Sequence, residues 1–266
     1  MKKRRTISLI AMATGLAIFA TGAAQADALD NIMKSGTIRV STDLAIPPSG
    51  MMDSSMKPTG SDVETAQLLA KDWGLKLQFV QTVGATRIPN LLTNKADIVI
   101  STLSVTPKRA EVIDFSKPYA TLSSDIGCLK SLKISDWKDL KGMHVGVTQG
   151  TTQDTMLTEK KDKNFTLARY KDDATTITAA VSGQVDCIAT STTIIDQIGK
   201  SNPNRPFEPK VNITHFNLAI GVKKGEPRLM KKINTWIDAN IANGKLNAIY
   251  KKFHGHDLPP DMRGKS

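Results

Sequence analysis

Residues 97–109 read Asp97-Ile98-Val99-Ile100-Ser101-Thr102-Leu103-Ser104-Val105-Thr106-Pro107-Lys108-Arg109, an apolar segment followed by a cluster of polar and charged residues. The apolar segment, residues 97–103, predicts a buried strand. Ser104, Thr106 and Arg109 follow at the carboxyl end, where open α/β sheets place their ligand crevice. The planar guanidinium of Arg109 is suited to bidentate capture of a carboxylate, with the two hydroxyls beside it. The alternative interpretation is a surface arginine in a loop.

Helical and strand patterns alternate on the amino-terminal side of this stretch. Ser61 and Glu64 have the spacing of a capping box, so we expect a helix to begin there with reciprocal side-chain caps. Gly74 is expected to end that helix. Strands alternating with helices predict a mostly parallel, layered α/β sheet. The other predicted segments on this side are a helix over 28–34, strands over 38–42 and 75–79, and a helix around 88–92.

The same alternation restarts on the carboxyl-terminal side. Two α/β units in one chain predict two lobes with a cleft between them. The predicted segments are a strand over 140–147, a helix around 177–181, strands over 185–189 and 216–222, and closing helices over 229–241 and 246–253.

Residues 149–152, Gln149-Gly150-Thr151-Thr152, lie where the strand over 140–147 passes into a helix. Free backbone amides at a helix start, with two hydroxyls beside them, can bind an anion. The alternative is that a threonine here caps its own helix.

The first 26 residues have the organisation of a secretory signal peptide. A basic segment, Met1-Lys2-Lys3-Arg4-Arg5, precedes an apolar run over 7–20 and the cleavage motif Ala24-Gln25-Ala26. A transmembrane anchor is the competing interpretation, but the run is interrupted and is shorter than the roughly 20 residues that a span needs. We therefore expect cleavage after Ala26 and an exported, soluble chain of 240 residues.

The composition is that of an ordinary globular protein of one or two domains, with 40% apolar, 23% charged and only 5% aromatic residues. Lysine and arginine outnumber aspartate and glutamate by 36 to 25, a formal net charge of +11. Four of the cations belong to the predicted signal peptide, which leaves +7 on the exported chain. The remaining cations are scattered without an aromatic stripe or long basic block, so we expect a solvated surface and no nucleic-acid partner.

The two cysteines, Cys128 and Cys187, are too far apart for a CxxC or zinc motif. Both lie in apolar, strand-like segments, so one disulfide and two buried thiols are both open interpretations. His254 and His256 have no third ligand beside them in the sequence, and we expect a solvated tail there and no metal site.

A series of short motifs follows along the exported chain at a characteristic spacing. The motifs are Gly60-Ser61-Asp62-Val63-Glu64, Ile88-Pro89-Asn90-Leu91-Leu92, Lys95-Ala96-Asp97, Thr106-Pro107-Lys108-Arg109, Ile113-Asp114-Phe115-Ser116-Lys117-Pro118-Tyr119, Leu140-Lys141-Gly142, Val145-Gly146-Val147, Gly150-Thr151-Thr152 and Gly183-Gln184-Val185-Asp186. Taken together, these motifs resemble the bacterial extracellular solute-binding proteins, family 3. The resemblance covers essentially the whole exported chain, and the block that ends at Tyr119 is highly specific.

The resemblance implies an α/β, two-lobed periplasmic-binding-protein fold of type II, the Venus flytrap, with the ligand cleft between the lobes. Lobe 1 would comprise residues 27–120 plus 216–266 and lobe 2 residues 121–215, with hinge strands near Ala120 and His215. It further implies a periplasmic monomer without cofactor or metal. Such a protein closes on a polar amino acid or a related small carboxylate and delivers it to the inner-membrane permease of an ABC importer.

The resemblance also implies which residues touch the ligand. Arg109 would clamp the ligand carboxylate, helped by neighbouring hydroxyls and by the amides of Thr151 and Thr152. The expected ligand-binding residues are Asp43, Ile46, Ser101, Thr102, Ser104, Thr106, Arg109, Thr151, Thr152 and Ser191.

Three departures from the family pattern bear on specificity. Ile46 and Gly84 stand where aromatic residues commonly hold the ligand side chain. Ser191 stands where an acidic residue usually meets the ligand ammonium. Either Asp43 or another acid takes that role, the local alignment is shifted, or the ligand is not a standard α-amino acid, because a buried ammonium without a carboxylate loses its strongest partner.

The sequence thus predicts a binding protein and not an enzyme. The alternative is an enzyme on the same scaffold that resembles the cyclohexadienyl dehydratases. Such an enzyme needs a general acid in the cleft, and the obvious position in lobe 2 holds Ser191.

Overall fold

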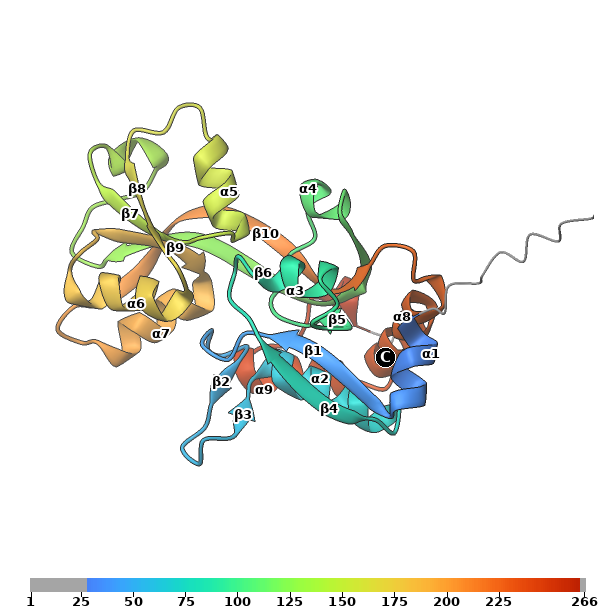
Figure 1. Ribbon diagram of the computed structural model, residues 1–266. Coiled ribbons are helices and arrows are strands. Elements are labelled where there is room, and N and C mark those ends of the chain that lie inside the picture. The colour runs from blue at the N-terminus through green and yellow to red at the C-terminus, as the bar shows by residue number, and fades with distance from the viewer. Residues whose placement is uncertain (1–27, 264–266) are drawn as a thin grey trace, which may run out of the picture.

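The computed structural model describes residues 28–263, so the predicted signal peptide and its cleavage site lie outside the described residues. Within the described part, eight strands form one sheet in the order β4-β1-β5-β10-β6-β9-β7-β8. Helices cover this sheet at both ends, and two long strands run through its middle (Figure 1). None of the helices between residues 28 and 263 is long and apolar enough to cross a membrane.

The elements follow one another in a regular order along the chain. They are α1 (Ala28–Ser35), β1 (Thr37–Thr42), β2 (Met51–Met52), β3 (Pro58–Thr59), α2 (Ser61–Asp72), β4 (Lys76–Gln81), α3 (Arg87–Leu92), β5 (Ile98–Val99), α4 (Pro107–Ala110), β6 (Ile113–Leu129), η1 (Trp137–Leu140), β7 (His144–Thr148), α5 (Thr152–Glu159), β8 (Thr166–Tyr170), α6 (Asp173–Ser182), β9 (Cys187–Ser191), α7 (Thr192–Ser201), β10 (Phe207–Lys223), α8 (Pro227–Ala242), α9 (Lys245–His254) and η2 (Pro260–Met262).

The fold has two lobes, as the sequence predicts. We call the part built on β4, β1 and β5 the first lobe, and the part built on β9, β7 and β8 the second lobe. The main core of the first lobe draws its buried residues from both ends of the described chain, for example Ile38 and Ile237. The cores of the second lobe are built around Val147 and Ile195, from the middle of the chain.

Two antiparallel strands, β6 and β10, connect the lobes. β5 pairs with β10 near Gly221, whereas β9 pairs with β6 only from Ser124 onwards. Between these points β6 and β10 pair chiefly with each other, for example at Ala120 opposite Leu218, and register shifts interrupt their ladder. A narrow, irregular two-strand connection is the kind of segment that absorbs a hinge motion.

The predicted capping box of α2 is wrong, although the helix is present. The residue before the helix is Gly60, with φ at 125°, and no described side chain caps it. The Ser61 hydroxyl instead lies 3.1 Å from His254 Nε2, and Glu64 pairs with Lys252. Both side chains thus join α2 to α9, because a tertiary contact competes with the local cap.

Several predicted strand limits also change. The strand expected over 97–103 contains only Ile98 and Val99, because the chain then turns at Thr102, where φ is 42°. Leu140, expected in a strand, lies in the 3₁₀ turn η1. β10 begins at Phe207, nine residues before the predicted start at 216, and the sequence reasoning missed β8 and α7.

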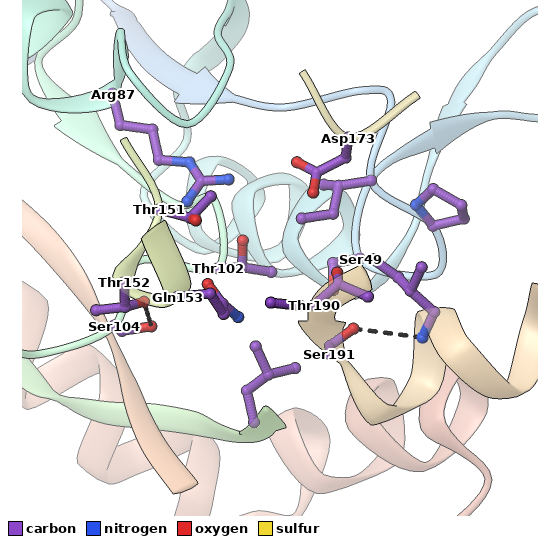
Figure 2. Close-up of a pocket in the computed structure, with 15 residues that line it drawn as sticks. Ser49, Arg87, Thr102, Ser104, Thr151, Thr152, Gln153, Asp173, Thr190 and Ser191 are labelled. Carbon is purple, nitrogen blue, oxygen red and sulfur yellow. Dashed lines mark hydrogen bonds between the residues drawn. The ribbon is translucent and has the colours of Figure 1, made fainter. Parts of the chain in front are cut away.

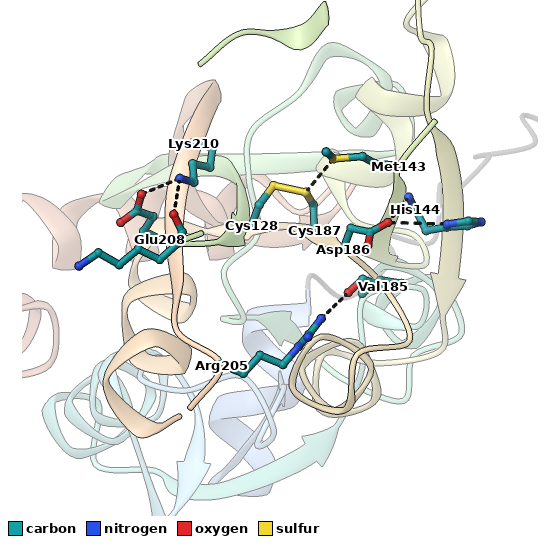
Figure 3. Close-up of a disulfide and its surroundings, with 10 residues drawn as sticks. Cys128, Met143, His144, Val185, Asp186, Cys187, Arg205, Glu208 and Lys210 are labelled. Carbon is teal, nitrogen blue, oxygen red and sulfur yellow. Dashed lines mark hydrogen bonds and ion pairs between the residues drawn. A yellow bond between two sulfur atoms is a disulfide. The ribbon is translucent and has the colours of Figure 1, made fainter. Parts of the chain in front are cut away.

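Cys128 and Cys187 form a disulfide, which decides between the two interpretations left open (Figure 3). They stand opposite each other in the paired strands β6 and β9, and both are fully buried. The disulfide therefore joins neighbouring strands within the second lobe.

Candidate functional site

A buried polar cavity lies where the two lobes face each other (Figure 2). The cavity volume is about 30 Å³, within a wider gap of about 450 Å³ between the lining atoms that is partly open to solvent. Both lobes contribute to its wall, which is rich in hydroxyl groups. The lining residues are Ile46, Pro47, Ser49, Arg87, Thr102, Ser104, Leu122, Thr151, Thr152, Gln153, Asp173, Ala189, Thr190, Ser191 and Ile194.

Arg87 supplies a cation to this cavity from the first lobe. It is the first residue of α3 and is only 3% exposed. Its Nε and Nη2 make no hydrogen bond to any of residues 28–263, and the Asp43 carboxylate lies 3.8 Å from Nη2. A buried guanidinium whose donors are open is suited to an anionic ligand group, because unpaired buried donors are costly.

Asp173 supplies a carboxylate from the second lobe, and its side chain also points into the cavity (Figure 2). It is the first residue of α6, and its Oδ1 accepts a hydrogen bond of 2.9 Å from the Thr148 hydroxyl. The other oxygen, Oδ2, has no hydrogen-bond partner among the described residues. Burial raises the pKa of Asp173 to about 6, although the attraction of Arg87 opposes this rise.

Six of the ten predicted ligand-binding residues line the cavity. Thr151 caps α5 by accepting a hydrogen bond from the Asp154 amide, so the interpretation that it caps its own helix is confirmed. Ser191 likewise caps α7 through the Ile194 amide. The six residues are Ile46, Thr102, Ser104, Thr151, Thr152 and Ser191.

The other four predicted residues are not among those that line the cavity. The Asp43 amide donates to the Ser101 hydroxyl, and both residues are buried behind the wall. Thr106 caps the short helix α4. Arg109 lies in an adjacent pocket that it shares with Arg87 and Gly150, and its role as a carboxylate clamp stays a prediction.

Arg109 uses its guanidinium to connect the lobes. Nη1 donates to the Ser104 carbonyl at 3.0 Å, and Nη2 donates to the Gly150 carbonyl of the second lobe at 3.3 Å. Burial, together with the nearby charge of Arg87, lowers the pKa of Arg109 to about 10, which leaves it charged at neutral pH.

Asp62 is a buried acid that fixes the backbone at Thr102, one of the residues that line the cavity. Asp62 accepts a hydrogen bond of 2.7 Å from the Thr102 amide and one of 2.6 Å from the Tyr119 hydroxyl. The Thr102 backbone has φ at 42°, a conformation that β-branched residues rarely adopt. Asp62 therefore stabilises the turn that replaces the end of the predicted strand.

The two lobes are in contact around the cavity, so the structure represents a closed arrangement. The Thr152 hydroxyl donates to the Ser104 hydroxyl across the lobes at 3.3 Å. The backbones approach closely at Gly84 and Gly150. A Cβ added at Gly84 would lie 2.8 Å from the Gln149 carbonyl oxygen, which gives a physical reason why no aromatic residue stands there.

Sequence reasoning missed Arg87 and Asp173, the two charged residues of the cavity wall. Arg87 directly precedes the motif that begins with Ile88, and Asp173 follows Asp172 at the start of a helix. Acidic residues are common at helix starts, so Asp173 does not stand out in the sequence. Arg87 stands out only once its burial is known. Within residues 28–263, no group of three or more His, Cys, Asp or Glu residues could hold a metal ion.

Comparison with known proteins identifies the group to which this chain is related. The ABC transporter glutamine-binding protein GlnH of Bacillus subtilis (strain 168) is 31% identical over 208 residues, which are 77% of this chain and 76% of that protein. The solved structure of the solute receptor for L-cysteine of Neisseria gonorrhoeae is 30% identical, with a TM-score of 0.81, and the match covers 89% of this chain and 98% of that one.

A reconstructed protein is similar as well. It is the ancestral amino acid-binding protein AncCDT-1, a precursor of cyclohexadienyl dehydratase, with 33% identity and a TM-score of 0.77, and the match covers 85% of this chain and 98% of that one. The model of one family, the bacterial extracellular solute-binding proteins, family 3, matches residues 38–256. This chain therefore belongs to the bacterial extracellular solute-binding proteins, family 3.

Proposed function

We propose that this protein is the periplasmic substrate-binding component of an ABC importer, and that it binds a polar amino acid or a related small carboxylate by closure of its two lobes. The proposal includes the lobe limits predicted from the sequence, 27–120 plus 216–266 for lobe 1 and 121–215 for lobe 2. It also includes removal of the signal peptide after Ala26 and function as a monomer that docks on a permease in the inner membrane.

One observation carries the proposal: the buried guanidinium of Arg87 faces a closed, hydroxyl-rich cavity with open donors. A carboxylate is the ligand group that a guanidinium recognises best. We propose that Arg87 binds the ligand carboxylate. Arg109, which donates hydrogen bonds to both lobes beside Arg87, adds a second positive charge near this carboxylate. The similar proteins that bind glutamine and cysteine support an amino acid as the ligand.

A thermal-shift screen of the twenty proteinogenic L-amino acids and L-cystine tests this proposal, with calorimetry on every compound that raises the melting temperature. The protein is first unfolded and refolded, so that ligand bound during expression is removed. We expect binding by at least one compound and loss of that binding in Arg87→Gln. Arg263→Gln is the matched control, because Arg263 is exposed and lies outside the cavity lining.

Closure is tested by small-angle scattering of the refolded protein with and without the amino acid found in the screen. A ligand that bridges both lobes favours the closed state, because it contacts both walls only there. We expect a smaller radius of gyration with the ligand. An unchanged radius would contradict the closure part of the proposal.

A second candidate function is an enzyme similar to the cyclohexadienyl dehydratases. The observation that favours it is Asp173, a cavity carboxyl whose pKa of about 6 suits a general acid. Incubation with cyclohexadienyl acids, followed by absorbance of an aromatic product, tests this candidate. Turnover that disappears in Asp173→Asn would replace the binding proposal.

A further inference from the structure

One carboxylate oxygen of Asp173 is buried without a hydrogen bond. The residue is only 5% exposed, and among residues 28–263 its carboxylate accepts a hydrogen bond from the Thr148 hydroxyl through Oδ1. Oδ2 has no hydrogen-bond partner in residues 28–263, and the side chain lines the cavity (Figure 2). A buried carboxylate oxygen without a hydrogen bond destabilises the folded state, unless a ligand donates a hydrogen bond to it.

Asp173 also differs from the rest of the cavity wall in charge. Asp173 and Arg87 are the charged residues among those that line the cavity, and they come from opposite lobes. Ser191, in the position where relatives were expected to carry an acid, is neutral and already accepts a hydrogen bond from the Ile194 amide. Asp43, the other candidate acid, lies behind the wall beside Arg87.

We propose that Asp173 receives the ammonium group of the ligand, so that the substrates are zwitterionic amino acids and simple carboxylates are excluded. This inference rests on the proposed function. Arg87 in the first lobe and Asp173 in the second lobe then bind oppositely charged ends of one molecule. A ligand that lacks either charge leaves a buried ion without a partner, and the closed state loses stability.

Charged groups around Asp173 influence its pKa, and this pKa predicts how ligand affinity depends on pH. Arg87 of α3 attracts it, whereas Asp43 after β1 and Asp172 before α6 repel its ionised form. An ammonium binds the ionised carboxylate, whose pKa is about 6. Ligand affinity should therefore fall as the pH drops through this value, by about tenfold at pH 5 relative to neutral pH.

The test compares amino acids with their deaminated counterparts by titration calorimetry. The probe pairs are L-glutamine and glutaramate, L-cysteine and 3-mercaptopropionate, L-arginine and 5-guanidinopentanoate, and L-histidine and imidazolepropionate. The refolded wild-type protein is compared with Asp173→Asn. Asp172→Asn is the matched control, because it makes the same change one residue away, where the carboxylate caps α6 at the Thr175 amide.

We expect at least one amino acid to bind the wild type about 100-fold more tightly than its counterpart. Asp173→Asn should lower the affinity for that amino acid at least 30-fold and leave the affinity for the counterpart within threefold. It should also abolish the fall in affinity at pH 5. Asp172→Asn should behave as the wild type does.

The outcomes separate this inference from the proposed function. If a deaminated counterpart binds as well as its amino acid or better, or if Asp173→Asn binds the amino acid as the wild type does, the ammonium role is overturned and the binding function stands. If neither the amino acids nor their counterparts bind the refolded wild type, both fail. The comparison of counterparts and the pH profile use the wild type alone, so they decide the question even if Asp173→Asn does not fold.

Discussion

The two walls of the cavity carry opposite charges at equivalent places, the first residue of a helix. Asp173 begins α6, where the positive end of the helix dipole favours a carboxylate. Arg87 begins α3, where the same dipole disfavours a cation, and Arg109 adds a second positive charge nearby. Asp43, whose carboxylate lies 3.8 Å from the Arg87 guanidinium, and Asp173 of the second lobe offset these two unfavourable effects, while Nε and Nη2 of Arg87 keep no hydrogen-bond partner among residues 28–263.

The lobes also differ in how they are held together. The first lobe has a large core that gathers residues from both ends of the described chain, and a smaller cluster that includes Leu91 and Val99. The second lobe has two clusters as well and adds a disulfide between β6 and β9. The four predictions below examine these contrasts.

The largest expected effect is the loss of the disulfide. The variant Cys128→Ala with Cys187→Ala removes a cross-link between residues 59 positions apart. Loop-closure entropy predicts a decrease in the free energy of unfolding of roughly 4 kcal/mol. Urea denaturation measures it. Because the cysteines lie outside the cavity lining, ligand affinity in the folded variant should be unchanged, and a large loss of affinity would contradict the expectation that the disulfide stabilises the fold without shaping the cavity.

The next largest effect concerns Arg87. Arg87→Gln should weaken amino-acid binding by at least about 100-fold, or roughly 3 kcal/mol, because charge-assisted hydrogen bonds to the carboxylate are lost. Arg87→Lys keeps the charge but not the planar fork and should recover only part of the affinity.

A double variant is the control for this prediction. Arg87→Gln leaves Asp43 buried beside a neutral residue, so the double variant with Asp43→Asn restores charge balance. If the double variant binds the amino acid as tightly as the wild type, the carboxylate role of Arg87 is wrong.

A smaller effect is expected at the contact between the lobes. Gly84→Ala adds a methyl group that would lie 2.8 Å from the Gln149 carbonyl oxygen of the second lobe. The clash exists only in the closed state, so we expect affinity to fall by about tenfold while the melting temperature of the ligand-free protein stays within 1–2 °C. Gly74→Ala is a control for glycine replacement, since a Cβ there meets nothing within 4 Å, although its φ of +67° adds local strain.

The smallest effect is the pH dependence of stability in the absence of ligand. Burial raises the pKa of Asp173 to about 6 from an ordinary value of 3.8, so the folded state binds this proton more tightly than the unfolded state does. The stabilisation is complete below about pH 4 and is lost as the pH rises through 6.

We therefore expect Asp173 to make the ligand-free protein about 1 kcal/mol more stable at pH 5 than at pH 7.5. Asp62, whose pKa burial also raises to about 6, should add a similar amount. Denaturation curves at the two pH values, for the wild type and Asp173→Asn, measure the share of Asp173. An identical pH dependence in both proteins would contradict the raised pKa.

Much of this organisation is local in the sequence. The alternation of strands and helices, the buried run that begins at Ile98 and the hydroxyls at Ser104, Thr151 and Thr152 follow from periodicity and turn chemistry. The family resemblance rests on contiguous motifs, and the family is confirmed. These features are readable because short-range spacing decides them.

The tertiary structure alone decided which charges meet in the cavity. Arg87 and Asp173 are 86 positions apart and come from different lobes, so they line one cavity only in the folded chain. Long-range packing also paired Cys128 with Cys187, redirected Ser61 towards His254 and turned the chain at Thr102. Local patterns determine which elements form, whereas the burial of a charge is a property of surfaces that meet only in the folded chain.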